Sequence, residues 1–319
     1  MKQHNYLLVF SLFLLLLFSC SQEAAVFTGS LSLEEAAKRY TANPEVQQFL
    51  KLARDVVAYT KNQYGIQFDE KLLRFVPGSS ESLAKRFIAL PKQSLKPATD
   101  ALYYDSKVLD AQKAKAEQSG LETFIQNENP LWIAGKPAPL LEAWARWPYD
   151  RQVERVFQLE FHQYVASKLQ WQDMEGLTRF LAEKATEEYL RDTLGGASPV
   201  LARYISEQRD EKTFATLFPD FAERVINLYT HRDPGATSDS IEANRTQLLK
   251  VWLAEYKKRY AERFLTNRYA NFGDQIPSDA EILAIQHQLS LLGPWKEYQG
   301  QYRRAGETVT SYLKVAVKE

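Results

Sequence analysis

The sequence predicts an α+β protein that is mainly helical, with a small N-terminal sheet packed on a helical C-terminal half. Short apolar stretches bounded by proline or glycine lie between residues 72 and 134, as expected for strands. From residue 151 onward, most segments repeat apolar residues at helical spacing. The composition, with 45% hydrophobic and 13% aromatic residues, is typical of a globular chain.

The first expected elements are two helices. A short one covers residues 33–40, where Ser32 and Glu35 have the spacing of a capping box. A longer one covers 45–64, between a proline and a glycine. The longer helix has an apolar face made of Val46, Phe49, Leu50, Leu52, Ala53, Val56 and Val57.

Four strand-like stretches follow, at 72–76, 87–90, 121–125 and 131–134, and a polar helix is expected at 106–120. Further helices are expected near 151–170, 174–194, 198–208, 211–230, 238–270, 278–290 and 305–317. The sequence shows no internal repeat, no glycine-rich phosphate loop and no low-complexity segment. We therefore expect residues 31–319 to form a single domain.

The N-terminus is typical of a bacterial lipoprotein signal peptide. Lys2 precedes an apolar run at 6–18 that is too short for a membrane span and fits a secretory signal. The run ends in Leu-Phe-Ser-Cys at 17–20, which resembles a lipobox. Cys20 is the only cysteine, so it forms no internal disulfide, and acylation gives it a role.

These features predict a signal peptide at 1–19, lipid such as palmitate on Cys20, and a tether at 20–30. The lipid bilayer is then a partner of the acylated cysteine. Ser21 follows Cys20 in place of an aspartate, which by analogy with enteric lipoproteins favours the outer membrane. The expected location is therefore the bacterial cell envelope.

The charge balance argues against nucleic acid as a partner. Without Lys2, the remaining chain has 39 basic and 40 acidic residues, because the full chain has 40 of each. It carries no strong basic patch and no acidic tail. A peptide or an envelope protein is the partner class that the sequence leaves open.

The segment VFQLEFHQYV, residues 156–165, looks like a metal-binding helix with part of its chemistry replaced. A zinc peptidase of the His-Glu-x-x-His type would place its motif across 158–162. Only His162 matches, while Gln158 and Leu159 stand where the first histidine and the glutamate would be. Gln158 and His162 are four residues apart, so they share one stripe of the helix.

Several ordered segments extend this likeness. They are RFIALPKQSLKP at 86–97, ALYYDSKVLDAQKAKAEQSGLETFI at 101–125, KPAPLLEAWARWP at 136–148, QLEFHQ at 158–163, DMEGLTRFLAEKATEEYL at 173–190 and NFGDQIPSDAEILAIQ at 271–286. Together they resemble a family of bacterial predicted aminopeptidases, metallopeptidase-like proteins that are often lipoproteins. The resemblance implies a zincin-like metallopeptidase architecture. It also implies that His162 is the second zinc-binding histidine and Glu175 the downstream metal ligand.

The resemblance further implies that the catalytic machinery is degenerate. Gln158 replaces the first histidine, and its amide is a poor zinc ligand. Leu159 replaces the glutamate that would accept a proton from zinc-bound water. Pro139 falls in the strand that would face the substrate, where it removes a backbone donor. We therefore expect no zinc cofactor, no peptidase activity, and a surviving cleft for a peptide or protein partner.

Glu160 is the one carboxylate within the motif, and it comes one residue late. This shift rotates it by roughly 100° around the helix, away from the stripe of Gln158 and His162. We expect Glu160 to pair with a nearby arginine or lysine and not to act as a catalytic base.

Two alternatives remain open from the sequence. In the first, the protein is an active divergent hydrolase whose zinc is held by His162, Glu175 and a remote His231 or His287. In the second, it is a structural envelope lipoprotein without a site. A histidine near His162 and Glu175 would favour the first alternative. A filled apolar space around Gln158 would favour the second.

Overall fold

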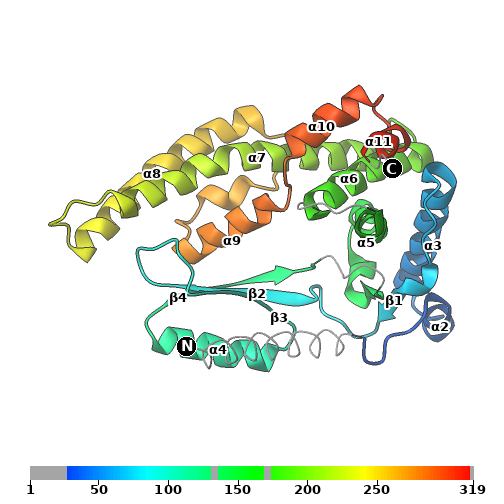
Figure 1. Cartoon of the computed structure of the whole chain (residues 1–319), viewed down its shortest axis with the longest axis horizontal. Coiled ribbons are helices and arrows are strands. Elements are labelled where there is room, and N and C mark those ends of the chain that lie inside the picture. Colours follow the sequence, from blue (N-terminus) through cyan, green and yellow to red (C-terminus); the bar gives the residue numbers. More distant parts are fainter. Residues whose placement is uncertain (1–26, 131–135, 169–173, 317–319) are drawn as a thin grey trace, which may run out of the picture.

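The computed structural model describes residues 27–130, 136–168 and 174–316, and it confirms the mainly helical α+β class (Figure 1). The helices are α2 Leu33–Arg39, α3 Pro44–Tyr64, α4 Ser106–Gln118, α5 Tyr149–Lys168, α6 Met174–Leu194, α7 Pro199–Thr230, α8 Ser238–Arg263, α9 Asp279–Ser290, α10 Trp295–Arg304 and α11 Val309–Ala316. The strands are β1 Leu73–Val76, β2 Ala84–Leu90, β3 Thr99–Tyr103, β4 Glu122–Glu128 and β5 Ala138–Leu141. Short 3-10 turns occupy Glu70–Leu72, Glu142–Arg146 and Ala270–Gly273.

The strands form two small sheets. β2 lies between β3 and β4 in an antiparallel sheet, while β1 pairs with β5 in parallel. Alternate residues of β2 face opposite sides, so Phe87 and Ala89 pack toward α4 while Ile88 and Leu90 pack toward α9. Figure 1 shows the three-stranded sheet between these two helices. β4 thus lies at an edge of its sheet.

The main core joins the N-terminal helices to the two central ones. α5 packs along α6 and against α3, and the chain returns through α10 and α11 to cover α6. Its largest buried side chains are Trp144, Phe49, Phe75, Phe157, Phe161, Tyr298 and Tyr312. This core fixes one face of α5 against α3 and α6.

A long helical hairpin, α7 with α8, projects from the body (Figure 1). It has its own aromatic core, in which Phe214, Phe221 and Trp252 pack around Phe272. The predicted break between 208 and 211 is wrong, because α7 runs unbroken through it. Asp210 is buried there and accepts hydrogen bonds from the backbone N–H groups of residues 265 and 266, at the chain turn after α8.

Most predicted elements are confirmed within a few residues. The capping box of Ser32 and Glu35 is present, and Gly65 ends α3 with a positive φ of 69°. The sequence reading missed α10 as a helix, and α8 ends at Arg263, earlier than residue 270. The expected strand at 131–134 and the lipidation site Cys20 lie outside the described residues.

One observation concerns the membrane. Among the described helices, none combines enough length and apolar character to cross a bilayer. Residues 27–30 form a turn that leads into α2, where Leu31 bridges to Phe75 of β1.

Candidate functional site

Helix α5 directs the two replaced motif positions to different surroundings. Gln158 is 8% exposed and lines a cleft at the centre of the molecule. Leu159 is fully buried in the main core. The position that the family resemblance assigns to the catalytic base therefore faces packed side chains.

Glu160 corrects the expectation of an arginine or lysine partner. Its side chain is fully buried, and within the described residues neither carboxyl oxygen has a hydrogen-bond partner or an ion pair. Burial raises its pKa to about 8, against a smaller opposing effect of the Thr60 hydroxyl on α3. The cause is the rotation around α5, which directs Glu160 into the core beside α3, where none of the described lysines or arginines pairs with it.

The candidate metal ligands lie in separate environments. Glu175 pairs with Arg179 one turn along α6, with 2.8 Å between Oε1 and Nη2. His231 follows α7 at the exposed tip of the hairpin, and His162 is half-buried on α5. In the described part of the chain, no three histidine, cysteine, aspartate or glutamate side chains gather as a metal site would need.

His287 on α9 is the histidine that comes nearest to such a site. Its Nε2 lies 2.7 Å from Nη1 of Arg86 and 3.8 Å from a carboxyl oxygen of Glu128. Burial and the Arg86 guanidinium lower its pKa, while Glu175 is near enough to act weakly in the opposite direction. Arg86 and Arg179 therefore lie among His287, Glu128 and Glu175, the three side chains that could otherwise bind a metal.

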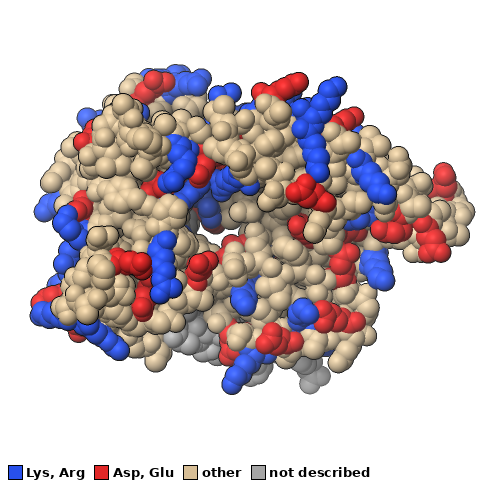
Figure 2. All heavy atoms as spheres, turned by 180° about the vertical axis from the view of Figure 1, so that it is seen from behind, with Lys and Arg blue, Asp and Glu red and all other residues tan. Residues whose placement is uncertain are grey.

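The central cleft has a volume of about 430 Å³, within the usual range of about 300–1,000 Å³ for ligand pockets. Seen from behind, the molecule is hollowed near its centre, with acidic and basic side chains around the opening (Figure 2). Its walls come from the end of β4, from α5, α6 and α7, and from the segment joining α9 to α10. The lining includes the amides Gln126, Asn127, Asn129, Gln158, Gln208 and Gln288, and the aromatics Trp147, Phe180 and Trp295.

Four of the basic side chains that line the cleft have carboxylate partners. Arg151 holds Glu154 at 2.8 Å and Glu207 at 2.5 Å. The other three pairs are Lys212 with Glu183, Arg268 with Glu211 at 3.4 Å, and Arg179 with Glu175. These charges neutralise one another within the wall.

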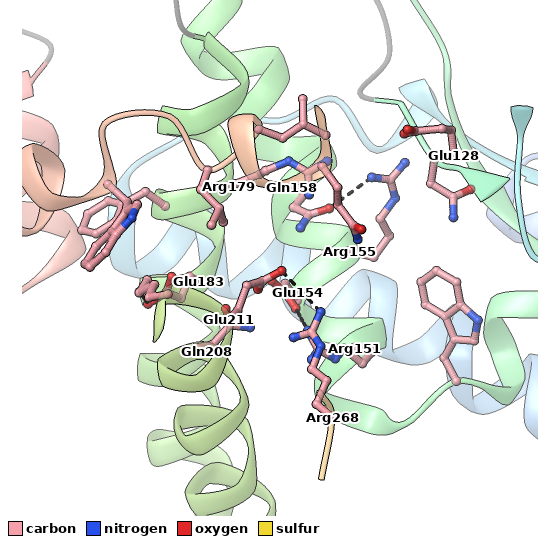
Figure 3. Close-up of a pocket in the computed structure, with 18 of the residues that line it drawn as sticks. Glu128, Arg151, Glu154, Arg155, Gln158, Arg179, Glu183, Gln208, Glu211 and Arg268 are labelled. Atoms are coloured by element: carbon pink, nitrogen blue, oxygen red, sulfur yellow. Dashed lines mark hydrogen bonds and ion pairs between the residues drawn. The ribbon is translucent and has the colours of Figure 1, made fainter. Parts of the chain in front are cut away.

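Arg155 on α5 differs from these four. It is 5% exposed, yet within the described residues it forms no ion pair with a carboxylate. Its Nη1 donates to Oε1 of Gln158 at 3.1 Å (Figure 3), and its Nη2 donates to the carbonyl of Pro130 at 3.2 Å. The guanidinium also lies 4.8 Å from the ring centroid of Trp144. Burial, and then the nearby Arg179, lower the pKa of Arg155 to about 9.

Other buried polar atoms in the wall lack partners. Oε1 of Gln126 and Nε2 of Gln208 have no hydrogen-bond partner among the described residues. An unsatisfied buried group of this kind costs roughly 1–3 kcal/mol. The side-chain amides that line the cleft favour a polar ligand that supplies both donors and acceptors.

Sequence reasoning found Gln158 but missed Arg155 and the amides around it. The only local signal was an arginine among the apolar positions Val153, Val156 and Phe157 of a buried helix. The chain matches no family model, no curated protein and no solved structure in the comparisons made.

Proposed function

We propose that this chain is a lipid-anchored protein of the bacterial cell envelope that binds peptides in the central cleft without cleaving them. The observation that carries the proposal is the cleft itself, an open cavity of about 430 Å³ lined by side-chain amides and aromatic residues. Side-chain amides both donate and accept hydrogen bonds, as backbone peptide groups do. The aromatic residues supply surfaces for apolar side chains of a ligand.

The edge position of β4 gives a second reason to propose a peptide. Residues 126–129, at the end of this edge strand, line the cleft. An extended peptide can add to such an edge through main-chain hydrogen bonds, while alternate side chains enter neighbouring pockets. The strand that the family resemblance assigns to the substrate is a different one. That strand, β5, is buried along its whole length and pairs with β1.

The absence of cleavage is proposed from the donor chemistry. Gln158 offers a neutral amide where the resemblance implies a histidine, and Leu159 lies in the core, where it meets no substrate. The proposal includes descent from a zincin-like peptidase, which is the architecture that the resemblance implies. It likewise includes acylation of Cys20 and placement in the outer membrane, on the lipobox-like sequence.

The structure bears on the two alternatives, a structural protein without a site and a divergent zinc hydrolase. A structural protein without a site would fit a filled apolar space around Gln158, but Gln158 borders an open polar cleft. A divergent zinc hydrolase would need three ligands together; His287 comes within 3.8 Å of Glu128, but among the described residues no three such side chains gather. Metal binding there would require Arg86 and Arg179 to leave their present contacts.

The test uses the full chain purified in detergent and an equimolar library of tripeptides. Native mass spectrometry should detect about one intact peptide per chain. Gln288→Trp, at the mouth of the cleft, should abolish retention, whereas Gln112→Trp, on an exposed position of α4, should leave it unchanged. No retention by the wild type would refute binding. Chelator-sensitive shortening of the peptides would instead support the hydrolase.

A further inference from the structure

The charge of Arg155 indicates which part of a ligand the cleft holds. We infer that Arg155 binds a free carboxylate of the bound peptide, and that the cleft selects its ligands on this group. This inference rests on the proposed peptide-binding function and specifies its ligand class. The guanidinium lines the cleft and has no carboxylate partner in the described segments.

The neighbouring charges leave Arg155 positive. Arg179, which acts on it most strongly among the charged groups, has the same sign. Glu175 and Glu154 act on it more weakly, and each is paired with an arginine of its own, Arg179 and Arg151 respectively. A buried cation is costly unless it is paired. A ligand carboxylate would supply the missing partner.

The contacts of Arg155 hold its guanidinium in one orientation. Gln158 and the Pro130 carbonyl each accept one hydrogen bond, and the plane lies near the indole ring of Trp144. Arginine has five N–H donors, so these two bonds leave capacity for an acceptor from the cleft. A carboxylate matches a guanidinium with two parallel hydrogen bonds, which a lysine in the same place would not provide.

A purely structural role for Arg155 makes a different prediction. If it only links α5 to Pro130 and Trp144, its replacement should change stability and leave ligand preference unaltered. Ligand preference, and not stability, therefore separates the two roles.

The carboxylate could come from the peptide C-terminus or from an acidic side chain. The chemistry at Arg155 is the same for both, so the test must distinguish them. A peptide whose C-terminus is amidated keeps its acidic side chains and loses only the terminal charge.

The experiment compares two tripeptide libraries of equal composition, one with free and one with amidated C-termini, by competition for the full chain in detergent. The wild type should prefer the free acids by roughly tenfold or more, as expected for a charge-assisted pair. Arg155→Gln should remove this preference, and Arg155→Lys should restore part of it. Arg146→Gln, at an arginine whose side chain is 76% exposed and which lies outside the cleft, should keep it.

Each outcome decides between the claims. If amidated peptides bind as well as free acids, but only when they contain aspartate or glutamate, and Arg155→Gln abolishes this, the carboxylate comes from a side chain. If both libraries bind equally whatever their acidic content, the inference is wrong and peptide binding stands. If neither library binds the wild type, both the function and the inference fail. Because the comparison on the wild type needs no variant, misfolding of Arg155→Gln would not obscure it.

Discussion

Glu160 shows how strongly one helical position can depend on its surroundings. It lies fully buried beside α3, and no cation among the described residues neutralises its charge. Burial therefore raises its pKa from 4.5 to about 8 in the folded state. The folded protein holds the proton over a pH range in which the unfolded chain has already released it.

This difference predicts a pH-dependent stability. Because the folded pKa is raised, the stabilising contribution is complete below about pH 4.5 and is lost as the pH rises to about 8. Relative to Glu160→Gln, the wild-type free energy of unfolding should fall by up to about 1.4 kcal/mol per pH unit in this window. Urea unfolding at several pH values measures it. As a control, Glu34→Gln replaces an exposed carboxylate that is paired with Lys38, and its free energy of unfolding should change with pH in this window as that of the wild type does. If the difference in free energy of unfolding between wild type and Glu160→Gln stayed constant with pH, the raised pKa of Glu160 would be contradicted.

Arg155 illustrates what a sequence cannot supply at the residue scale. Its position on a helix was predictable from the apolar repeat around it. Its lack of a carboxylate partner depends on the packing of α5 against Trp144 and on the fold that brings Pro130 near it. Such tertiary relations carry no local pattern, which is why Gln158 was recognised and Arg155 was not.

At the scale of elements, local signals predicted helices well where caps and periodicity agreed. α3 and α6 begin and end within about one residue of the expected positions. The sequence predicted a break in α7 at the polar residue Asp210, and this prediction was wrong. Asp210 is buried within the helix, where its carboxylate accepts hydrogen bonds from the turn after α8. Pairing of β1 with β5 in a separate sheet joins residues more than sixty positions apart, so short-range patterns could not reveal it.

The two faces of α5 make a prediction about restoring the zinc motif. Gln158→His should cost roughly 1–3 kcal/mol, because it removes the oxygen that accepts a hydrogen bond from the buried Arg155. Leu159→Glu should cost about 3 kcal/mol or more, because it places a charge in the main core, whereas Leu159→Met should cost less than about 1.5 kcal/mol. Chemical unfolding gives these values. If the double variant, Gln158→His with Leu159→Glu, were as stable as Gln158→His alone, the burial of position 159 would be contradicted.

At the scale of the whole molecule, the proposed anchor sets where the cleft operates. If Cys20 carries the lipid, a short tether at 20–30 joins the membrane to the domain that begins near α2. One acyl chain alone holds a protein only marginally, so stable anchoring calls for more than one chain.

Cys20→Ala tests this arrangement. The variant should lose labelling by a lipid precursor and should not be processed by signal peptidase II, because the acceptor thiol is absent. Pulse labelling and membrane fractionation of cells measure both effects. Unchanged processing together with unchanged membrane association would contradict the lipobox interpretation.

The central claim is that the cleft holds an intact peptide. The most direct measurement is a crystal structure of the protein grown with the tripeptide that it retains best. We predict an uncleaved peptide in the central cleft, beside the edge of β4, with a carboxylate within hydrogen-bond distance of Arg155. A peptide bound elsewhere would contradict the account, as would a metal ion held by His287, Glu128 and Glu175 beside a shortened peptide.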